Sequence, residues 1–417
     1  MRIAIGEDAR RRWIPRMCLA LVLVYLVTVT DHFLAWYCAG RGDYRHLYLA
    51  TRLAPGNSEY RYRLGRFLAL AGKAPESASQ FQAAIDLNPH DARYFLSLAQ
   101  AYEIMGDMQR QGNALEQAIH ADPTTPSLAW EAANFYLIRG ENAKALQEFR
   151  VVLESDPASS VLALQRCWRA LPNVDALLAD VVPPSTSAYL AFLDLLMSRH
   201  EASASARVWD ALMALHKPIE RRYVFDYVRF NVQQKQPDQA RVAWQQAAGL
   251  LGWSEYLPAP GNLIVNSDFG LDVLNGGFDW IYQKQPSVSL VLDPSEYHSG
   301  HNSLSIAFDG PGVHDAGIYQ WISVTPNTPY EFTGYYKSEE LEGAGGPAFA
   351  LHDAYSGQEL FHSDELKDAD FWKPVHGQFQ TGPDTRLLLF SVDRIPAGSP
   401  IRGRLWIDDL QLTQTQP

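Results

Sequence analysis

The stretch NPHDARYFLSLAQAYEIMGDMQRQGNALEQAIHADP, residues 88–123, decides the fold of the N-terminal half of the chain. It holds two helical segments on either side of Gly106, where glycine can end the first helix because it tolerates a positive φ. A proline stands in a polar loop near each end, and the same spacing of 34 residues continues on both sides. This series of prolines is Pro55, Pro89, Pro123 and Pro157. A fixed period of this length predicts a stack of helical pairs.

The residues inside the period agree with this interpretation, and the units resemble tetratricopeptide repeats. Small residues at the eighth and twentieth positions let the two helices of a unit approach closely, and larger residues fill the space between units. Three units, 58–91, 92–125 and 126–159, carry the pattern. Their matching residues include Leu64, Gly65, Phe81 and Ala84, then Leu98, Ala99, Leu115 and Ala118, then Ala132, Ala133, Ala145 and Phe149.

The pattern continues more weakly at 187–220 and 221–254, after an interruption by prolines within 160–186. We therefore expect an α-solenoid of tetratricopeptide repeats over residues 41–254. Each unit of such an array packs only on its neighbours, which leaves a long concave surface. The resemblance implies that this surface binds a protein partner, as a peptide or a helix. The alternative is that the array is a spacer.

The N-terminus combines a basic tail, residues 1–13, with an apolar segment that we interpret as a transmembrane signal anchor at 14–40. Its apolar run, Met17–Thr30, is short for a span but is followed by a second one, Phe33–Ala39. A cleaved signal peptide is the alternative, although no small-residue cleavage site follows the run. Five arginines precede the run, against Arg41 and Arg45 after it. This bias predicts a single-pass protein of the bacterial inner membrane with a cytoplasmic N-terminus and an extracytoplasmic bulk.

Beyond a linker expected at 255–261, the sequence changes to short alternating runs separated by Gly, Pro, Asn and Asp, which predicts a β-sandwich over 262–417. The order of several motifs resembles the jelly-roll carbohydrate-binding modules of xylanases, which have a galactose-binding-like fold. These motifs are NLIVNSDF (262–269), HSGHNSLSI (298–306), YQWISVTPNTPYEFTGYYK (319–337), FWKPVHGQFQT (371–381) and LWIDDLQL (405–412).

Charge narrows the range of partners. From Asn262 to the end there are 21 acidic and 8 basic residues, whereas the formal net charge of the whole chain is −12. An acidic C-terminal domain is unsuited to binding phosphate backbones, so nucleic acid is not expected as a partner. The three cysteines, Cys18, Cys38 and Cys167, allow neither a disulfide framework nor a cysteine metal site.

The candidate glycan-binding residues are aromatic. Strand alternation places Ile318, Gln320 and Ile322 on one face and Tyr319 and Trp321 on the other, where the rings can serve as a platform for the C–H faces of a sugar. On the next strand the candidates are Tyr335 and Tyr336. The alternative for each of these aromatics is a place in the sandwich core or a cover over its second face.

The resemblance also implies a structural calcium ion between the first and last strands of the sandwich. The matching carboxylates are Asp268 and Asp408, since Ca²⁺ prefers hard oxygen ligands. The family usually has an acidic residue where this chain has Gly270, which weakens the prediction. No other cofactor is expected.

Catalytic motifs are missing from the sequence. The histidines lack HExxH spacing, and neither a GxSxG elbow nor a phosphate-binding glycine loop occurs. We therefore expect a membrane-anchored envelope scaffold, not an enzyme, that binds a protein partner through its repeats and a glycan through its sandwich, in service of polysaccharide or glycoconjugate assembly. One alternative is a purely protein–protein assembly factor, and another is a glycan-active enzyme.

Overall fold

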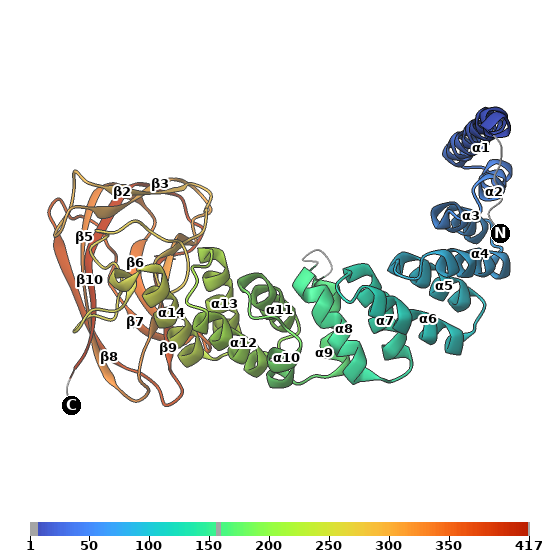
Figure 1. The fold of residues 1–417 in the computed structure, drawn as a ribbon. Helices are drawn as coiled ribbons and strands as arrows, with labels where there is room; N and C mark the ends of the chain where they lie inside the picture. Colours follow the sequence, from blue (N-terminus) through green and yellow to red (C-terminus); the bar gives the residue numbers. More distant parts are fainter. Residues whose placement is uncertain (1–6, 156–159, 416–417) are drawn as a thin grey trace. The chain divides into compact units, whose positions relative to one another are not determined.

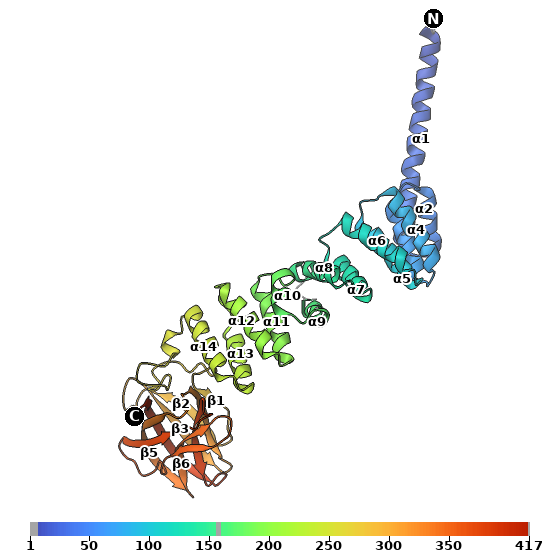
Figure 2. The same ribbon diagram turned by 90° about the horizontal axis from the view of Figure 1, so that it is seen from below.

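A computed structural model describes residues 7–155 and 160–415, and it confirms a helical N-terminal part and a C-terminal β-sandwich (Figure 1). The chain forms two compact units, Met1–Pro183 and Pro184–Pro417. The first unit is helical, whereas the second combines helices with both sheets of the sandwich (Figure 2). Pro157, the last proline of the series, lies outside the described residues.

The helices of the first unit form antiparallel pairs whose ends follow from local sequence. The side chains of Asn57, Asp91 and Asp107 each accept a hydrogen bond from a backbone N–H and begin α3, α5 and α6. The turns inside the pairs hold Gly72, Gly106 and Gly140 at φ of 73°, 74° and 74°. The helix bounds are α1 Glu7–Arg41, α2 Tyr44–Leu53, α3 Ser58–Leu70, α4 Ala74–Leu87, α5 Ala92–Ile104, α6 Met108–Ala121, α7 Pro126–Ile138, α8 Asn142–Ser155, α9 Ser160–Ala170 and α10 Val174–Asp180.

Packing within a pair explains the small residues of the repeat. A Cβ at Gly65 on α3 would lie 2.7 Å from the ring of Phe81 on α4, so only glycine allows this approach. Leu64, Phe81 and Ala84 are all buried, as the repeat pattern predicts. The core of the unit therefore consists of helix–helix contacts that recur with the sequence period.

The first helix, α1, is the apolar one. Its stretch Trp13–Arg41 is 29 residues long and apolar enough to cross a membrane, a composition that a signal sequence shares. Toward its end Cys38 and Ala39 are buried against Ala50 of α2. The apolar helix therefore pairs with α2 as the first helix of a repeat pairs with the second.

The second unit begins with two further helix pairs. Their bounds are α11 Thr186–Ser198, α12 Ala202–Ala214, α13 Arg221–Gln233 and α14 Pro237–Leu251, followed by a short 3₁₀ turn η1 at Ser254–Tyr256. Trp209 of α12 stacks on Tyr227 of α13 with ring centroids 4.4 Å apart. Aromatic packing thus joins the two pairs.

The sandwich consists of two five-stranded antiparallel sheets, β1-β4-β9-β6-β7 and β2-β3-β10-β5-β8. Its core lies between them and includes Phe269, Trp280, Phe332, Phe349 and Phe390. The strand bounds are β1 Ile281–Tyr282, β2 Val288–Asp293, β3 Ser303–Gly310, β4 Asp315–Ser323, β5 Pro329–Gly343, β6 Gly346–Asp353, β7 Glu359–His362, β8 Lys373–Gln380, β9 Leu387–Ile395 and β10 Ile401–Gln414.

The expected linker at 255–261 does not separate two compact units, because α13 and α14 pack directly against the sandwich. A Cβ at Gly277 would lie 2.0 Å from the ring of Trp244 on α14, and one at Gly276 would lie 2.5 Å from Phe225 on α13. The indole N–H of Trp244 also donates to the carbonyl of Tyr256 at 2.9 Å. The division between compact units falls instead at Pro183 and Pro184.

Candidate functional site

The outer face of the sheet β1-β4-β9-β6-β7 carries a groove of about 440 Å³ that contains Tyr319 and Trp321. Ile318, Gln320 and Ile322 of β4 point into the core, whereas the two aromatic side chains between them are half-buried on the outer face. Two of the predicted glycan-binding residues therefore lie together in a hollow of the surface. The groove is lined by Gln283, Asp315, Gly317, Ile318, Tyr319, Trp321, His352, Leu389, Ser391 and Asp393.

A β-bulge shapes one end of the groove. The pairing of β4 with β9 shifts register between Asp315 and Tyr319, and Gly317 in this interval has a φ of 72°. A Cβ at Gly317 would lie 2.4 Å from the carbonyl oxygen of Gln283, so the bulge requires glycine. The backbone N–H of Gly317 donates to the carboxylate of Asp315 at 2.6 Å, which fixes this acid at the rim.

Side chains of β6 and β9 form the opposite wall. Nε2 of His352 lies 3.0 Å from Oδ2 of Asp393, and the hydroxyl of Ser391 donates to Oδ1 of the same carboxylate at 2.7 Å. Ser391 is the cross-strand partner of Tyr319, and Leu389 is the partner of both Trp321 and His352. The polar wall is thus held beside the two rings by the register of the sheet.

The two rings lie at an angle to each other. Their centroids are 6.1 Å apart and their planes are inclined by 56°. Apolar ring faces beside hydroxyl, imidazole and carboxylate groups suit a ligand with apolar C–H faces and hydroxyl edges. A carbohydrate has this chemistry.

The other two predicted aromatics occupy different surroundings on the second sheet. Tyr336 is 8% exposed and belongs to the core, so its proposed role as a binding platform is corrected. The reason is strand alternation, since adjacent residues of β5 point to opposite faces. Tyr335 faces outward, but its ring stacks on His298 with centroids 3.6 Å apart and planes inclined by 14°.

A loop of the chain itself lies on this second face, and Asp408 holds the loop in place. Oδ2 of Asp408 accepts hydrogen bonds from the backbone N–H groups of His298 and Ser299 at 2.7 and 2.9 Å. Oδ1 accepts a third from Asp409 at 2.7 Å. Burial raises the pKa of Asp408. The loop places His298 on the ring of Tyr335, so that one face of this ring is occupied by the chain itself.

The two carboxylates expected as calcium ligands, Asp268 and Asp408, both accept hydrogen bonds from backbone N–H groups. Both oxygens of Asp408 are already used by backbone donors, and Oδ1 of Asp268 accepts from the N–H of Gly270 at 3.1 Å. Within residues 7–155 and 160–415, no group of three or more His, Cys, Asp or Glu side chains could hold a metal ion. The donor set therefore favours a structural role for Asp408 over calcium binding.

Sequence reasoning missed the polar residues of the groove, namely Asp315, His352, Ser391 and Asp393. They come from three strands that are separated by up to about eighty residues along the chain. Only the register of β4, β9 and β6 brings them together, and a single sequence does not contain that register. The glycine of the bulge, Gly317, was the one local signal available.

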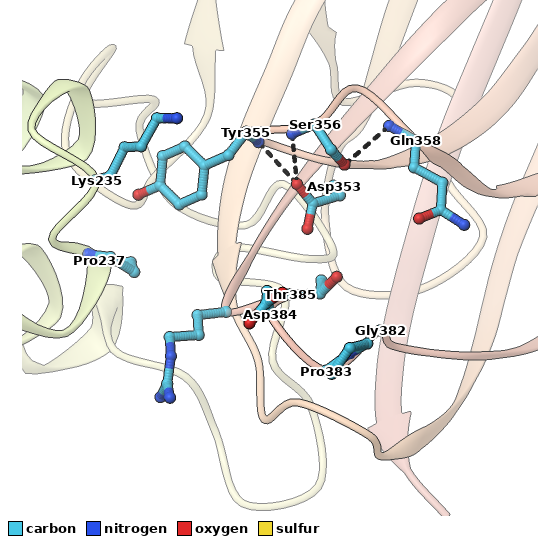
Figure 3. A pocket seen from close by; sticks show the side chains of 11 residues that line it. Lys235, Pro237, Asp353, Tyr355, Ser356, Gln358, Gly382, Pro383, Asp384 and Thr385 are labelled. Carbon is cyan, nitrogen blue, oxygen red and sulfur yellow. Dashed lines mark hydrogen bonds between the residues drawn. The ribbon is translucent and has the colours of Figure 1, made fainter.

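A second hollow, of about 610 Å³, lies where the α13–α14 turn meets two loops of the sandwich (Figure 3). Lys235 and Pro237 come from the turn, and the ring of Tyr355 points toward them. The backbone N–H groups of Tyr355 and Ser356 donate to Asp353 at 2.9 and 2.7 Å. Burial raises the pKa of Tyr355 to about 12. The hollow mixes charges of both signs and favours no particular ligand class.

The repeats expose apolar side chains at matching positions. Leu70, Ile104 and Ile138 end α3, α5 and α7, lie 34 residues apart and are 88%, 67% and 73% exposed. Equivalent positions of a stacked repeat lie on the same side of the array. We call these three exposed apolar side chains the apolar row.

Comparison with known proteins supports the prediction that the helical part consists of tetratricopeptide repeats. A tetratricopeptide repeat family matches residues 47–92, 71–124 and 112–160. MamA, known from a crystal structure, is 18% identical with a TM-score of 0.30, over 38% of this chain and 88% of that chain. No curated protein sequence matches the chain.

Two carbohydrate-binding modules are among the solved structures similar to this chain. A family 4 module is 15% identical over 36% of this chain and 99% of that chain, with a TM-score of 0.28. The xylan-binding CBM22-1 domain of Paenibacillus barcinonensis Xyn10C is 19% identical over 38% of this chain and 97% of that chain, with a TM-score of 0.26. Residues 47–160 are therefore tetratricopeptide repeats, and the C-terminal β-sandwich has carbohydrate-binding modules among its structural neighbours.

Proposed function

We propose that the chain is a membrane-anchored scaffold that binds a glycan in the groove of its sandwich and a protein partner along its repeats. The groove around Tyr319 and Trp321 carries the proposal. It combines two accessible ring faces with the polar groups of Asp315, His352 and Asp393 in a hollow of about 440 Å³. Accessible ring faces beside hydroxyl, imidazole and carboxylate groups are the arrangement that a sugar-binding platform needs.

The apolar row supports the protein-binding part of the proposal. Large apolar side chains at Leu70, Ile104 and Ile138 gain nothing from their own repeats, because most of each side chain faces water. A bound helix or peptide would bury them. A partner is first identified by cross-linking in cells. The triple substitution Leu70→Ser, Ile104→Ser and Ile138→Ser should then leave the repeats folded and weaken the binding of that partner.

Anchoring is supported by α1 and by the charge around it. The helix is long enough to span a bilayer, and arginines are more numerous before its apolar run than after it. This arrangement favours a cytoplasmic N-terminus, in which case both binding surfaces would lie on the outer side of a bacterial inner membrane. There the scaffold would hold a polysaccharide near its assembly or export machinery.

A glycan-active enzyme is the second candidate, because Asp315 and Asp393 are cross-strand partners within the groove. Glycoside hydrolysis needs one carboxylic acid that stays protonated and a second carboxylate. Here Asp315 accepts from Gly317 and Gln285, and Asp393 accepts from Ser391. Both carboxylates are thus engaged by neutral donors of the sandwich, whereas the ring faces of Tyr319 and Trp321 beside them can contact a ligand, and this favours binding as the first candidate.

A glycan array tests the proposed function. The full chain in detergent is applied to bacterial surface polysaccharides and plant oligosaccharides, and bound glycans are then incubated with the protein and examined for new reducing ends. We expect retention of at least one glycan class without cleavage. Absence of binding across the array would favour the protein–protein assembly factor, and release of reducing ends would favour the enzyme.

A further inference from the structure

The charged side chains that line the groove are of one sign. Asp315 and Asp393 are acidic, and neither lysine nor arginine is among the residues that line it within the described ranges. Lys284 follows Gln283 in the sequence but is not part of the lining. The rest of the sandwich adds to this field, with 21 acidic and 8 basic residues from Asn262 onward.

Neutral donors hold both carboxylates in place without cancelling their charge. Asp315 accepts from the backbone N–H of Gly317 at 2.6 Å and from the amide of Gln285 at 3.3 Å. Asp393 accepts from the hydroxyl of Ser391 at 2.7 Å. Its other contact is with the ring of His352 at 3.0 Å, the one side chain of the lining that can become a cation. A negative potential therefore lies beside the ring faces of Tyr319 and Trp321.

From this combination we infer that the groove selects glycans that carry free amino groups, such as partly deacetylated amino-sugar polymers. The inference rests on the proposed function, since it names the glycan class for the same groove. A protonated amine is attracted both by a carboxylate and by the face of an aromatic ring. A neutral glycan gains only the stacking and hydrogen bonds, and a glycan with uronic acids is repelled by both carboxylates.

The expected selectivity is about tenfold between amine-bearing and neutral forms of one glycan, because each of the two partly exposed carboxylates contributes about threefold. The order of affinity is then amine-bearing, neutral and uronate-bearing. Non-specific attraction of a polycation to an acidic protein would give the same order. The test therefore needs two variants that remove the same amount of negative charge, one from the groove and one from another part of the sandwich.

Titration calorimetry on the full chain in detergent provides the test, with glucosamine hexamer, N-acetylglucosamine hexamer and a hyaluronan oligosaccharide as probes. The pH is one at which the amines are protonated. The double variant Asp315→Asn, Asp393→Asn keeps side-chain shape and removes two charges from the groove. The matched control Glu339→Gln, Glu342→Gln removes two charges from exposed positions of β5 on the other sheet.

We expect the wild type and the control to prefer the amine-bearing hexamer by about tenfold, and the groove variant to lose that preference while it still binds the neutral hexamer. An equal loss in the control would assign the preference to the overall charge and overturn the inference. Equal or tighter binding of the neutral or uronate-bearing probe by the wild type would also overturn it, while glycan binding itself stands. If no glycan of any charge binds, the proposed function fails.

Discussion

The outer faces of the two sheets of the sandwich differ in what lies against their aromatic side chains: on one sheet a loop of the chain stacks on a ring, and on the other two rings line a groove. On β5, Tyr335 lies under His298, whose loop is tied down by the buried carboxylate of Asp408. On β4, Tyr319 and Trp321 line a groove of about 440 Å³. Outward-facing aromatic residues on β4 and β5, which belong to different sheets, thus have different surroundings, and the position of a neighbouring loop makes the difference.

The largest expected effect concerns the loop that stacks on Tyr335. Asp408→Ala removes the acceptor for three backbone N–H groups, and we expect a loss of about 3 kcal/mol in the free energy of unfolding. Chemical denaturation measures it. The control Asp309→Ala changes an exposed carboxylate on β3 and should cost less than about 0.5 kcal/mol.

Calcium gives a second test of Asp408. Because its oxygens already accept hydrogen bonds, we expect the melting temperature to be the same in Ca²⁺ and in a chelator. A melting temperature that rises with calcium concentration would restore the calcium site that the family resemblance implied.

Beside the groove, Gly317→Ala should deform the bulge. The added Cβ would meet the carbonyl of Gln283 at 2.4 Å, and we expect a loss of about 2–3 kcal/mol in the free energy of unfolding together with weaker glycan binding. Gly312→Ala is the matched control, since Gly312 also has a positive φ but has no atom within 4 Å of the place where a Cβ would lie. The control should cost about 1 kcal/mol. Equal losses would mean that the bulge does not need glycine for steric reasons.

A pH dependence is expected at Asp279, which precedes the edge strand β1 of the sheet that carries the groove. Burial raises its pKa to about 6, and Oδ1 has no hydrogen-bond partner. The folded state therefore holds a proton that the unfolded state releases near pH 4, so stability should fall as pH rises from about 4 to about 6. Asp279→Asn should flatten this dependence in denaturation curves, and an unchanged slope would contradict the assignment.

The smallest expected effect separates the two aromatic faces directly. Tyr319→Ala should weaken glycan binding about tenfold, because a ring face of the groove is lost. Tyr335→Ala should change it less than about twofold, because His298 covers that ring. Titration with the same glycan measures both variants. A larger loss of glycan binding in Tyr335→Ala than in Tyr319→Ala would place the ligand on the sheet that contains β5 and would contradict the proposal.

The sequence predicted the parts of the structure that repeat, but not the contacts that depend on the register of the β-strands. The 34-residue period predicted the helix pairs of the first unit, and alternation on β4 predicted that Tyr319 and Trp321 face outward. Alternation also places Tyr335 and Tyr336 on opposite faces of β5, so the prediction that both line one binding platform was inconsistent with the strand pattern itself.

Other parts could not be read from a single sequence. Asp315, His352 and Asp393 meet only through the pairing of β4, β9 and β6, and nothing local in the chain records that pairing. The same holds for α13 and α14, whose helical pattern does not indicate that Phe225 and Trp244 pack against Gly276 and Gly277 of the sandwich. Long-range packing of this kind depends on the tertiary structure rather than on local propensity.

The most direct test of the central claim is a comparison of glycan binding by the wild type and by Trp321→Ala, with the melting temperature of each measured in parallel. Trp321 is half-buried in the groove and does not belong to the sandwich core. We predict that the variant keeps a melting temperature near that of the wild type and loses binding by more than about tenfold. Unchanged binding by a folded Trp321→Ala variant would contradict the account.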